Sequence, residues 1–335
     1  MTVHLISVGV SVLEAMEHPG SKKLSGDLSR ACHDTQAFST LTFGFSTSER
    51  EAASRWVTGA LPGPGEPGHE PARAGQLRDI AGELDIGLWP ARISAEIETF
   101  RYASEAFPLS EDDIAILICS DTAEGLLAAV WNALGLVKGD PSHVTYLPDP
   151  DKDVKIVKGK AVIARVEGMD AASSDRFRDA MRHLGALACG LFESRTLNKQ
   201  DDFRFYLSGG FKAAIPYLIG MAEAIRSLDE VRLTELAVPE LAPGSGEAFP
   251  VRAFVMHEMS DRPKPIELPL RRLSSTAIRR ELAGFTGGIC REPRESTQLE
   301  GYAYEALPGG NGYQLTPFGE GLKTLFSRPA ESYGG

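Results

Sequence analysis

Cysteine is scarce in this chain, and long apolar runs are missing. The 335 residues contain four cysteines, none of them in a C-x-x-C pair: Cys32, Cys119, Cys189 and Cys290. Thiols so far apart argue against a disulfide framework or a zinc site and are typical of reduced cysteines in a cytosolic protein. The N-terminal residues lack the basic and apolar segments of a signal peptide, and no segment resembles a membrane span. We therefore expect a cytoplasmic protein that makes no membrane contact.

Metal-ligand and triad patterns are missing as well. No pair of carboxylates and no cluster of histidine, cysteine and aspartate has the spacing of metal ligands, so we expect no metal and no other cofactor. His4 and His257 lie in apolar, strand-like runs, where a histidine is more often a core residue than a catalytic base. No histidine near Ser11 supports that serine as the nucleophile of a triad. These absences indicate that the protein either catalyses a reaction without a metal or catalyses none and only binds a ligand.

Positive charge is in deficit. The formal net charge is −11, with 42% hydrophobic and 24% charged residues. These fractions are those of a soluble globular protein, and the length suits one large domain or two ordinary ones. An acidic surface argues against non-specific binding to nucleic acid, although a local basic pocket is compatible with it.

Strand-like and helical segments alternate along most of the chain. Apolar runs predict strands at 3–8, 113–119, 143–146, 161–166 and 203–207. Longer patterns predict helices at 46–56, 76–84, 94–107, 124–136, 172–193 and 211–226. The alternation predicts an α/β fold with a Rossmann-like, mainly parallel sheet covered on both faces. A Pro- and Gly-rich stretch at 61–74 predicts an exposed insertion, and runs at 252–257 and 265–270 predict a hairpin at the sheet edge.

The pattern changes towards the C-terminus. A short helix is predicted at 274–282 and a β-hairpin with a glycine-rich tip at 302–315. A last helix follows at 317–326, with Thr316 as its cap and proline at its first position. Helix, hairpin and helix predict a small winged-helix-like domain at 273–335, after a larger domain at 1–272.

The most informative segment is Ser-Gly-Gly-Phe-Lys at 208–212, where an apolar strand runs into a glycine pair, a lysine and a helix. Glycines there let the backbone turn tightly and approach a ligand. The helix start offers unpaired N–H groups and the positive end of its dipole. With the lysine, the segment predicts an anion site, most readily for phosphate. The spacing fits neither G-x-x-x-x-G-K-[ST] nor G-x-G-x-x-G, and a plain strand–helix turn with a surface lysine remains the alternative.

Two further loops, at 7–11 and 119–125, also follow predicted strands. Open α/β sheets bind ligands beyond the carboxyl ends of their strands, so both loops are candidate ligand contacts. For Ser120 and Asp121, capping of the following helix is the better interpretation, because Thr122 and the glycine at 125 fit it well. Ser11 is likewise open to a capping role.

Four motifs, in order along the chain, resemble one family. They are Ser-Val-Gly-x-Ser-Val-Leu at 7–13, Ile-Ser-Ala-Glu-Ile at 93–97, the turn at 120–125 and Ser-Gly-Gly-Phe-Lys at 208–212. They look like the CRISPR-associated CARF domains, the cyclic oligoadenylate sensors of type III antiviral defence systems. The stretches 257–258 and 267–270 are similar to the end of that domain, so the resemblance covers roughly residues 1–272. Val10 stands where the family usually carries threonine, which removes one side-chain hydrogen bond to the ligand.

The resemblance implies a homodimer in which two copies of each loop line a symmetric pocket. A cyclic oligonucleotide with rotational symmetry fits a two-fold axis, and the ring of four adenylates is the first expectation. Ser11 and Lys212 are implied as catalytic residues. The implied ligand-binding residues are Gly9, Val10, Ser120, Asp121, Thr122, Ser208, Gly209, Gly210 and Phe211.

The chain looks most like the stand-alone CARF proteins, some of which have winged-helix tails. The resemblance implies a ring nuclease, an enzyme that degrades the messenger and switches the response off. A ribose 2′-OH attacks the adjacent phosphate and leaves a 2′,3′-cyclic phosphate, which needs in-line geometry and charge stabilisation but no metal. Lys212 would stabilise the developing charge, and Ser11 would orient the ribose or the phosphate. A sensor that only binds the ring would use the same residues.

Two other functions are less well supported by the sequence. No histidine follows His257, so the C-terminal unit cannot supply the R-x(4–6)-H motif of a HEPN ribonuclease. The pairs Arg178/His183 and Arg252/His257 match that spacing but lie in predicted elements of the larger domain. Residues 273–335 hold six Lys/Arg and seven Glu, which is not the basic footprint of a DNA-binding regulator. A dimerisation or lid element is the better expectation for this unit.

Overall fold

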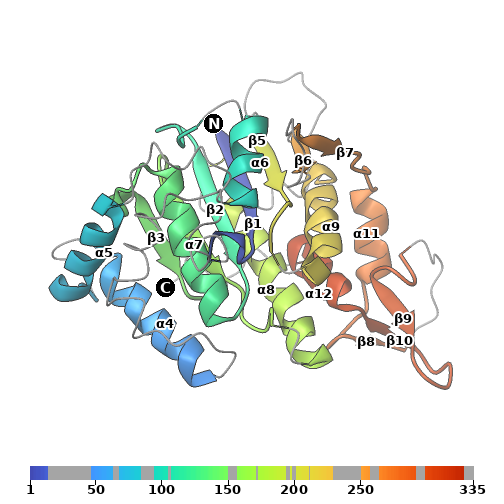
Figure 1. Ribbon diagram of the computed structural model, residues 1–335. Helices are drawn as coiled ribbons and strands as arrows, with labels where there is room; N and C mark the ends of the chain where they lie inside the picture. Colours follow the sequence, from blue (N-terminus) through green and yellow to red (C-terminus); the bar gives the residue numbers. More distant parts are fainter. Residues whose placement is uncertain are drawn as a thin grey trace.

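A mostly parallel sheet forms the centre of the molecule (Figure 1). The computed structural model describes residues 1–13, 47–62, 68–83, 94–104, 107–149, 157–170, 173–193, 197, 201–210, 212–228, 250–256, 264–291 and 299–327. Within them, seven strands run in the order β3-β4-β2-β1-β5-β6-β7. Their bounds are β1 Thr2–Val8, β2 Ile114–Cys119, β3 Val144–Leu147, β4 Ala161–Arg165, β5 Asp202–Tyr206, β6 Val251–Val255 and β7 Ile266–Leu268. All neighbours pair in parallel except β6 and β7, so the predicted α/β class is confirmed.

Helices cover both faces of the sheet, as the continuous apolar strands require. Leu5 and Ile116 face a core shared with α8, α9 and α12, whereas Ile6 and Leu117 face a core shared with α4, α6 and α7. The helix bounds are α4 Thr47–Ala60, α5 Pro71–Glu83, α6 Ala95–Ser104, α7 Ala123–Leu136, α8 Ser174–Glu193, α9 Ile215–Arg226, α11 Ser275–Leu282 and α12 Pro317–Ser327. Short 3-10 turns lie at Pro141–His143 (η2) and Lys212–Ala214 (η3). In the described part of the chain, no helix combines the length and apolar character needed to cross a bilayer.

The prediction of an exposed insertion at 61–74 is wrong at both ends of the segment. Leu61 and Ala74 are buried, and α5 already begins at Pro71, since proline is well tolerated at a first helical position. Residues 63–67 of that stretch lie outside the described residues. The predicted edge hairpin is confirmed in its pairing, because β7 lies antiparallel to β6 with Ala253 opposite Leu268. Its connection, with His257, lies outside the described residues.

The C-terminal residues form the predicted helix, hairpin and helix. Strands β9 Tyr304–Ala306 and β10 Tyr313–Leu315 pair antiparallel, and β8 Ile289–Cys290 joins the other side of β10. Thr316 caps α12 by accepting a hydrogen bond from the Gly319 N–H at 3.1 Å. The winged-helix-like domain and the boundary after 272 stay predictions.

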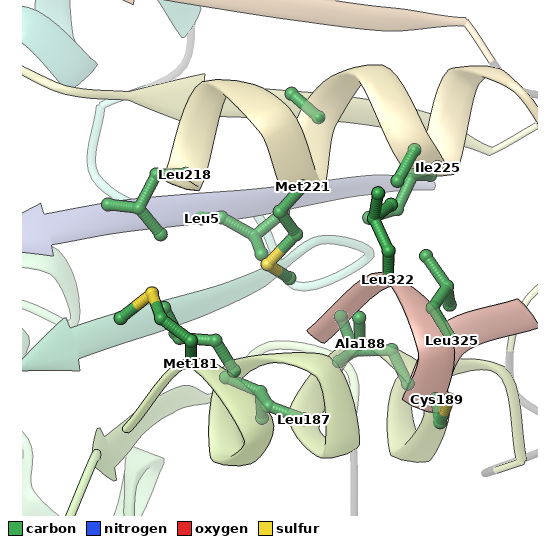
Figure 2. Close-up of a cluster of buried hydrophobic side chains, with 14 of the residues drawn as sticks. Leu5, Met181, Leu187, Ala188, Cys189, Leu218, Met221, Ile225, Leu322 and Leu325 are labelled. Atoms are coloured by element: carbon green, nitrogen blue, oxygen red, sulfur yellow. The ribbon is translucent and has the colours of Figure 1, made fainter. Parts of the chain in front are cut away.

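Helix α12 completes the core beside the sheet. Leu322 and Leu325 lie in one apolar cluster with Met181 of α8 and Met221 of α9 (Figure 2). Helices α8 and α12 approach closely, since a Cβ built at Gly185 of α8 would lie 2.5 Å from the carbonyl oxygen of Gly321 of α12. The C-terminal unit therefore shares its apolar core with the sheet.

Candidate functional site

The three candidate loops follow three adjacent strands. They leave the carboxyl ends of β2, β1 and β5, which lie side by side in the sheet. Strand β1 lies between β2 and β5 in the sheet. The strands that follow β1 directly in the chain add on the β2 side, and the later strands add on the β5 side, so the strand order reverses between β1 and β5. Ligands of open α/β sheets bind at such a switch point. We call the meeting place of Gly9–Ser11 with Ser208–Gly210 the switch point of this sheet.

Glu96, the second residue of α6, lies between these two loops. Its side chain is 0% exposed, and its Oε1 accepts a hydrogen bond from the Gly9 N–H at 2.6 Å. Its Oε2 accepts one from the Ser11 hydroxyl at 2.9 Å, and the Ala95 N–H donates to the same Ser11 oxygen at 3.3 Å. The sequence analysis quoted Glu96 within a motif but gave it no role. Its place within that motif was the signal that the sequence offered.

Ser94 supports Glu96 from the buried side. Its Oγ lies 2.6 Å from Glu96 Oε2 and 2.6 Å from Asn132 Oδ1, and its single proton can be donated to one of them. Ser94 also accepts a hydrogen bond from the Ile97 N–H at 3.2 Å, in the manner of a helix N-cap. Glu96 is therefore held in place by α6 and α7 as well as by the β1 loop.

The glycines of the switch point are required by their protein neighbours. A Cβ at Gly9 would lie 2.6 Å from the Gly210 nitrogen, and one at Gly209 would lie 1.9 Å from Glu96 Oε1. Gly210 has a φ of +93°, and a Cβ there would lie 2.0 Å from Ser7 Oγ. The glycine pair lets the β5 loop pack directly onto the β1 loop and Glu96.

The Ser208 hydroxyl forms hydrogen bonds with other groups of the protein. Its Oγ lies 2.5 Å from Thr99 Oγ1 and accepts a hydrogen bond from the Met256 N–H at 2.8 Å. It thereby links the β5 loop to α6 and to the end of β6. Ser208 shapes the switch point, and its hydroxyl is already engaged.

Val10 and Lys212 are the exposed residues among those described at the site. Val10 is 40% exposed, and Lys212 lies at the first position of η3. Ser11 is half-buried, as are Gly9 and Ser208–Gly210. Phe211, a predicted ligand contact, lies outside the described residues. The exposed layer thus presents one apolar side chain and one ammonium group above the buried carboxylate of Glu96.

The loop after β2 divides into a cap and an ion-pair centre. Thr122 caps α7 by accepting the Gly125 N–H at 3.0 Å, as expected, and Ser120 Oγ lies 3.0 Å from the Thr122 hydroxyl. A capping role for Asp121 is wrong. Its carboxylate is turned away from the helix start towards arginines of other elements.

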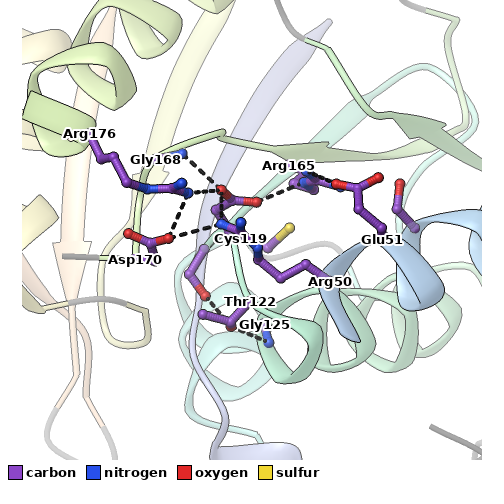
Figure 3. Close-up of polar contacts among 12 residues, drawn as sticks. Arg50, Glu51, Cys119, Thr122, Gly125, Arg165, Gly168, Asp170 and Arg176 are labelled. Carbon is purple, nitrogen blue, oxygen red and sulfur yellow. Dashed lines mark hydrogen bonds and ion pairs between the residues drawn. The ribbon is translucent and has the colours of Figure 1, made fainter. Parts of the chain in front are cut away.

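Asp121 is 1% exposed and accepts hydrogen bonds from three guanidinium groups. Figure 3 labels the arginines that carry them, Arg50, Arg165 and Arg176. Arg50 of α4 donates at 2.8 Å, Arg165 at the end of β4 at 2.9 Å, and Arg176 of α8 at 2.8 Å. The Gly168 N–H adds a fourth hydrogen bond at 3.0 Å. These four donors use the acceptor capacity of the carboxylate, so Asp121 binds protein rather than ligand.

Two more carboxylates balance the arginines. Asp170 pairs with Arg50 at 3.0 Å and with Arg176 at 2.7 Å, and Glu51 pairs with Arg165 at 3.1 Å. Burial opposes the charge on Arg165, but Tyr146, Asp121 and Glu51 together raise its pKa. We call these six charged residues the arginine cluster. It ties α4, β2, β4 and α8 together at the carboxyl edge of the sheet.

Histidine His4 lies in the core, as predicted. It is 1% exposed, its Nδ1 lies 2.8 Å from the Tyr206 hydroxyl, and its Nε2 lies 3.6 Å from Asp113. Burial lowers the pKa of His4, although Asp113 raises it in part. His4 stands near the amino end of β1, at the opposite edge of the sheet from Gly9.

No protein-family model matches this chain, and a search among curated proteins finds no match. The family resemblance therefore depends on the four motifs themselves. The described residues of all four, at 7–13, 94–97, 120–125, 208–210 and 212, lie at the carboxyl edge of β2, β1 and β5. Three of them, which include segments about two hundred residues apart in the chain, meet around the buried carboxylate of Glu96.

Proposed function

We propose that this chain is a cytoplasmic CARF-type protein that binds a cyclic oligoadenylate as a homodimer and cleaves it slowly without a metal ion. The observation that carries the proposal is the meeting of three of the four motifs, at 7–13, 94–97 and 208–210, around Glu96, with Lys212 exposed two residues after Gly210. The fourth motif follows the neighbouring strand β2. The ring of four adenylates is the first choice. Its cleavage would switch off type III CRISPR signalling.

The contacts at the switch point refine which groups meet the ligand. The Gly9 N–H already donates to Glu96, and Asp121 is occupied by arginines, so neither is assigned to the phosphate. The ammonium group of Lys212 at the start of η3 is the natural partner of a phosphate. Val10, exposed and apolar, suits the face of an adenine or the same residue of a second copy.

The proposed reaction is an in-line transesterification. The ribose 2′-oxygen forms a bond to the adjacent phosphorus, and the bond from phosphorus to O5′ breaks. The products are linear, with a 2′,3′-cyclic phosphate at one end and a 5′-OH at the other. Lys212 stabilises the charge that develops on the phosphoryl oxygens, while the protein holds the attacking and leaving oxygens in line.

Calorimetric titration with rings of three, four and six adenylates tests the binding proposal. We expect one ring per two chains and a dissociation constant in the micromolar range or below. The corresponding binding free energy is about −8 kcal/mol or more negative. Linear oligoadenylate of the same length is the control and should bind more weakly. Absence of micromolar binding to every ring would overturn the proposal.

A ligand-responsive transcription regulator is the second candidate. The order of α11, the β9–β10 hairpin and α12 favours it, because winged helices share that order. The charge of residues 273–335, six Lys/Arg against seven Glu, argues against it, because binding to a phosphate backbone needs a basic surface. A ring-dependent shift of promoter DNA in a gel would support the regulator.

A further inference from the structure

We propose that Glu96 is a positioning residue that fixes the Ser11 hydroxyl as a hydrogen-bond acceptor for the ribose 2′-OH and takes up the proton which that group releases. The inference rests on the proposed function and adds a proton acceptor that the sequence did not reveal. It starts from two distances, 2.9 Å from Ser11 Oγ to Glu96 Oε2 and 2.6 Å from the Gly9 nitrogen to Glu96 Oε1.

The surroundings of Glu96 are those of a carboxylate. It accepts one backbone N–H and lies within hydrogen-bond distance of two hydroxyls, those of Ser11 and Ser94, while its side chain is completely buried. An ionised carboxylate has acceptor sites only, so each of these groups can point its proton at Glu96.

The direction of the Ser11 proton follows from this. A serine hydroxyl has one proton and two acceptor lone pairs. The proton points to Glu96, and one lone pair accepts the Ala95 N–H at 3.3 Å. Among the described residues no further donor reaches Ser11, which leaves one lone pair, so Ser11 can accept a hydrogen bond from a ligand but cannot donate one. A ribose 2′-OH is a donor and a phosphate oxygen is not, so Ser11 meets the ribose.

The same geometry gives a path for the proton. As the 2′-oxygen bonds to phosphorus, its proton passes to Ser11 Oγ, and the Ser11 proton passes to Glu96 Oε2. The bond from phosphorus to O5′ breaks, and O5′ takes a proton from water at the open side of the site. The hydroxide that remains is neutralised by the proton that Glu96 returns through Ser11. No proton is gained or lost over the cycle.

The test is Glu96→Gln in single-turnover cleavage of the four-adenylate ring, with protein in excess. Glutamine keeps the shape and the acceptor oxygen but cannot take up the proton. We expect the cleavage rate to fall by about 10²-fold or more, the usual contribution of a positioned base. Ring affinity should change by less than about threefold, because Glu96 lies below the ligand rather than against it.

Glu223→Gln is the matched control, since Glu223 is a buried carboxylate on α9 that pairs with Arg271 at 2.7 Å, outside the switch point. This variant should lose stability but cleave at the wild-type rate. A double-mutant cycle separates a relay from a structural role. Ser11→Ala and Glu96→Gln interrupt the same path, so the double variant should be no slower than the slower single one.

A ring with 2′-fluoro groups tests the Ser11 acceptor without altering Glu96. Fluorine cannot donate, so wild-type protein should bind this ring about fivefold more weakly than the natural one, the effect of one hydrogen bond. Ser11→Ala should bind both rings equally. This measurement decides the question if Glu96→Gln does not fold.

The outcomes are distinct from those of the binding proposal. A wild-type protein that binds no ring overturns the proposed function itself. A wild-type protein that binds the ring but leaves it intact overturns the relay and leaves the binding proposal standing. A folded Glu96→Gln variant that cleaves within about threefold of wild type, losses that add in the double variant, or equal binding of the 2′-fluoro ring each overturn the relay.

Discussion

Two buried carboxylates stand at the same edge of the sheet, and they differ in what surrounds them. Asp121, after β2, is neutralised by three arginines and a backbone N–H. Among the described residues, the carboxyl group of Glu96, beside β1 and β5, lies within hydrogen-bond distance of a backbone N–H and two hydroxyls, and no arginine or lysine forms an ion pair with it. The carboxylate of Asp121 joins helices and strands through ion pairs, whereas the carboxyl group of Glu96 lies 2.9 Å from the hydroxyl of the half-buried Ser11.

Asp121→Asn should therefore have the largest effect on stability. It leaves Arg50, Arg165 and Arg176 around an amide that cannot accept from all of them, and breaking a buried ion pair typically costs about 3–5 kcal/mol. Urea unfolding measures the loss. Glu51→Gln is the control, since Glu51 is 53% exposed and should cost less than about 1 kcal/mol. Similar losses in both variants would remove the contrast between the arginine cluster and the switch point.

The packing of the switch point is tested by a matched pair of glycines. Gly210 and Gly309 have φ values of +93° and +94°, but a Cβ at Gly210 meets Ser7 Oγ at 2.0 Å and one at Gly309 meets nothing within 4 Å. Gly309→Ala should cost about 1 kcal/mol from backbone strain alone. Gly210→Ala should cost about 2 kcal/mol more and abolish ring binding, because the β5 loop must move off β1. Equal unfolding free energies would mean that the switch point is loosely packed.

Lys212→Ala tests whether a residue of the switch point can affect ring binding without affecting stability. Loss of one charged contact in a partly desolvated site should weaken ring binding by roughly tenfold or more. Because Lys212 is exposed, the free energy of unfolding should stay within about 0.5 kcal/mol of wild type. Lys158→Ala is the control, since this exposed lysine precedes β4 at the opposite edge of the sheet. Wild-type affinity in the Lys212 variant would assign that lysine to solvent.

A third buried group, His4 at the amino end of β1, gives the smallest effect. Its pKa is lowered from 6.5, mainly by burial, against the influence of Asp113. The unfolded chain therefore binds a proton that the native state resists, so stability is full above pH 6.5 and falls as the pH drops below it.

The expected slope is at most about 1.4 kcal/mol per pH unit. Unfolding at pH 7 and pH 5.5 should show a smaller difference in His4→Gln than in wild type. An unchanged pH dependence in His4→Gln would show that His4 does not titrate with folding in this range.

Local patterns were enough to predict much of the frame. The apolar runs of β1, β2 and β5, the Thr122 cap and the start of α12 at Pro317 each depend on neighbours within a few residues. Contacts between distant positions could not be read in this way. The arginines that hold Asp121 come from positions 50, 165 and 176, and only the fold brings them to one carboxylate.

The role of Glu96 was hidden for the same reason. An acidic residue in the first turn of a helix is commonplace, because it suits the helix dipole. Its partners Gly9 and Ser11 lie 87 and 85 residues earlier in the chain. The motif at 93–97 marked the segment, but a contact across such a distance has no periodicity or spacing to reveal it.

The central claim is tested most directly by incubating excess protein with the four-adenylate ring in the presence of EDTA and separating the products by chromatography. We predict slow conversion to linear products with 2′,3′-cyclic phosphate ends, at the same rate with and without the chelator. An intact ring after hours, together with a ring-dependent shift of promoter DNA, would contradict the claim in favour of a regulator. An intact ring with no DNA shift would leave a module that binds the ring and passes the signal to a partner.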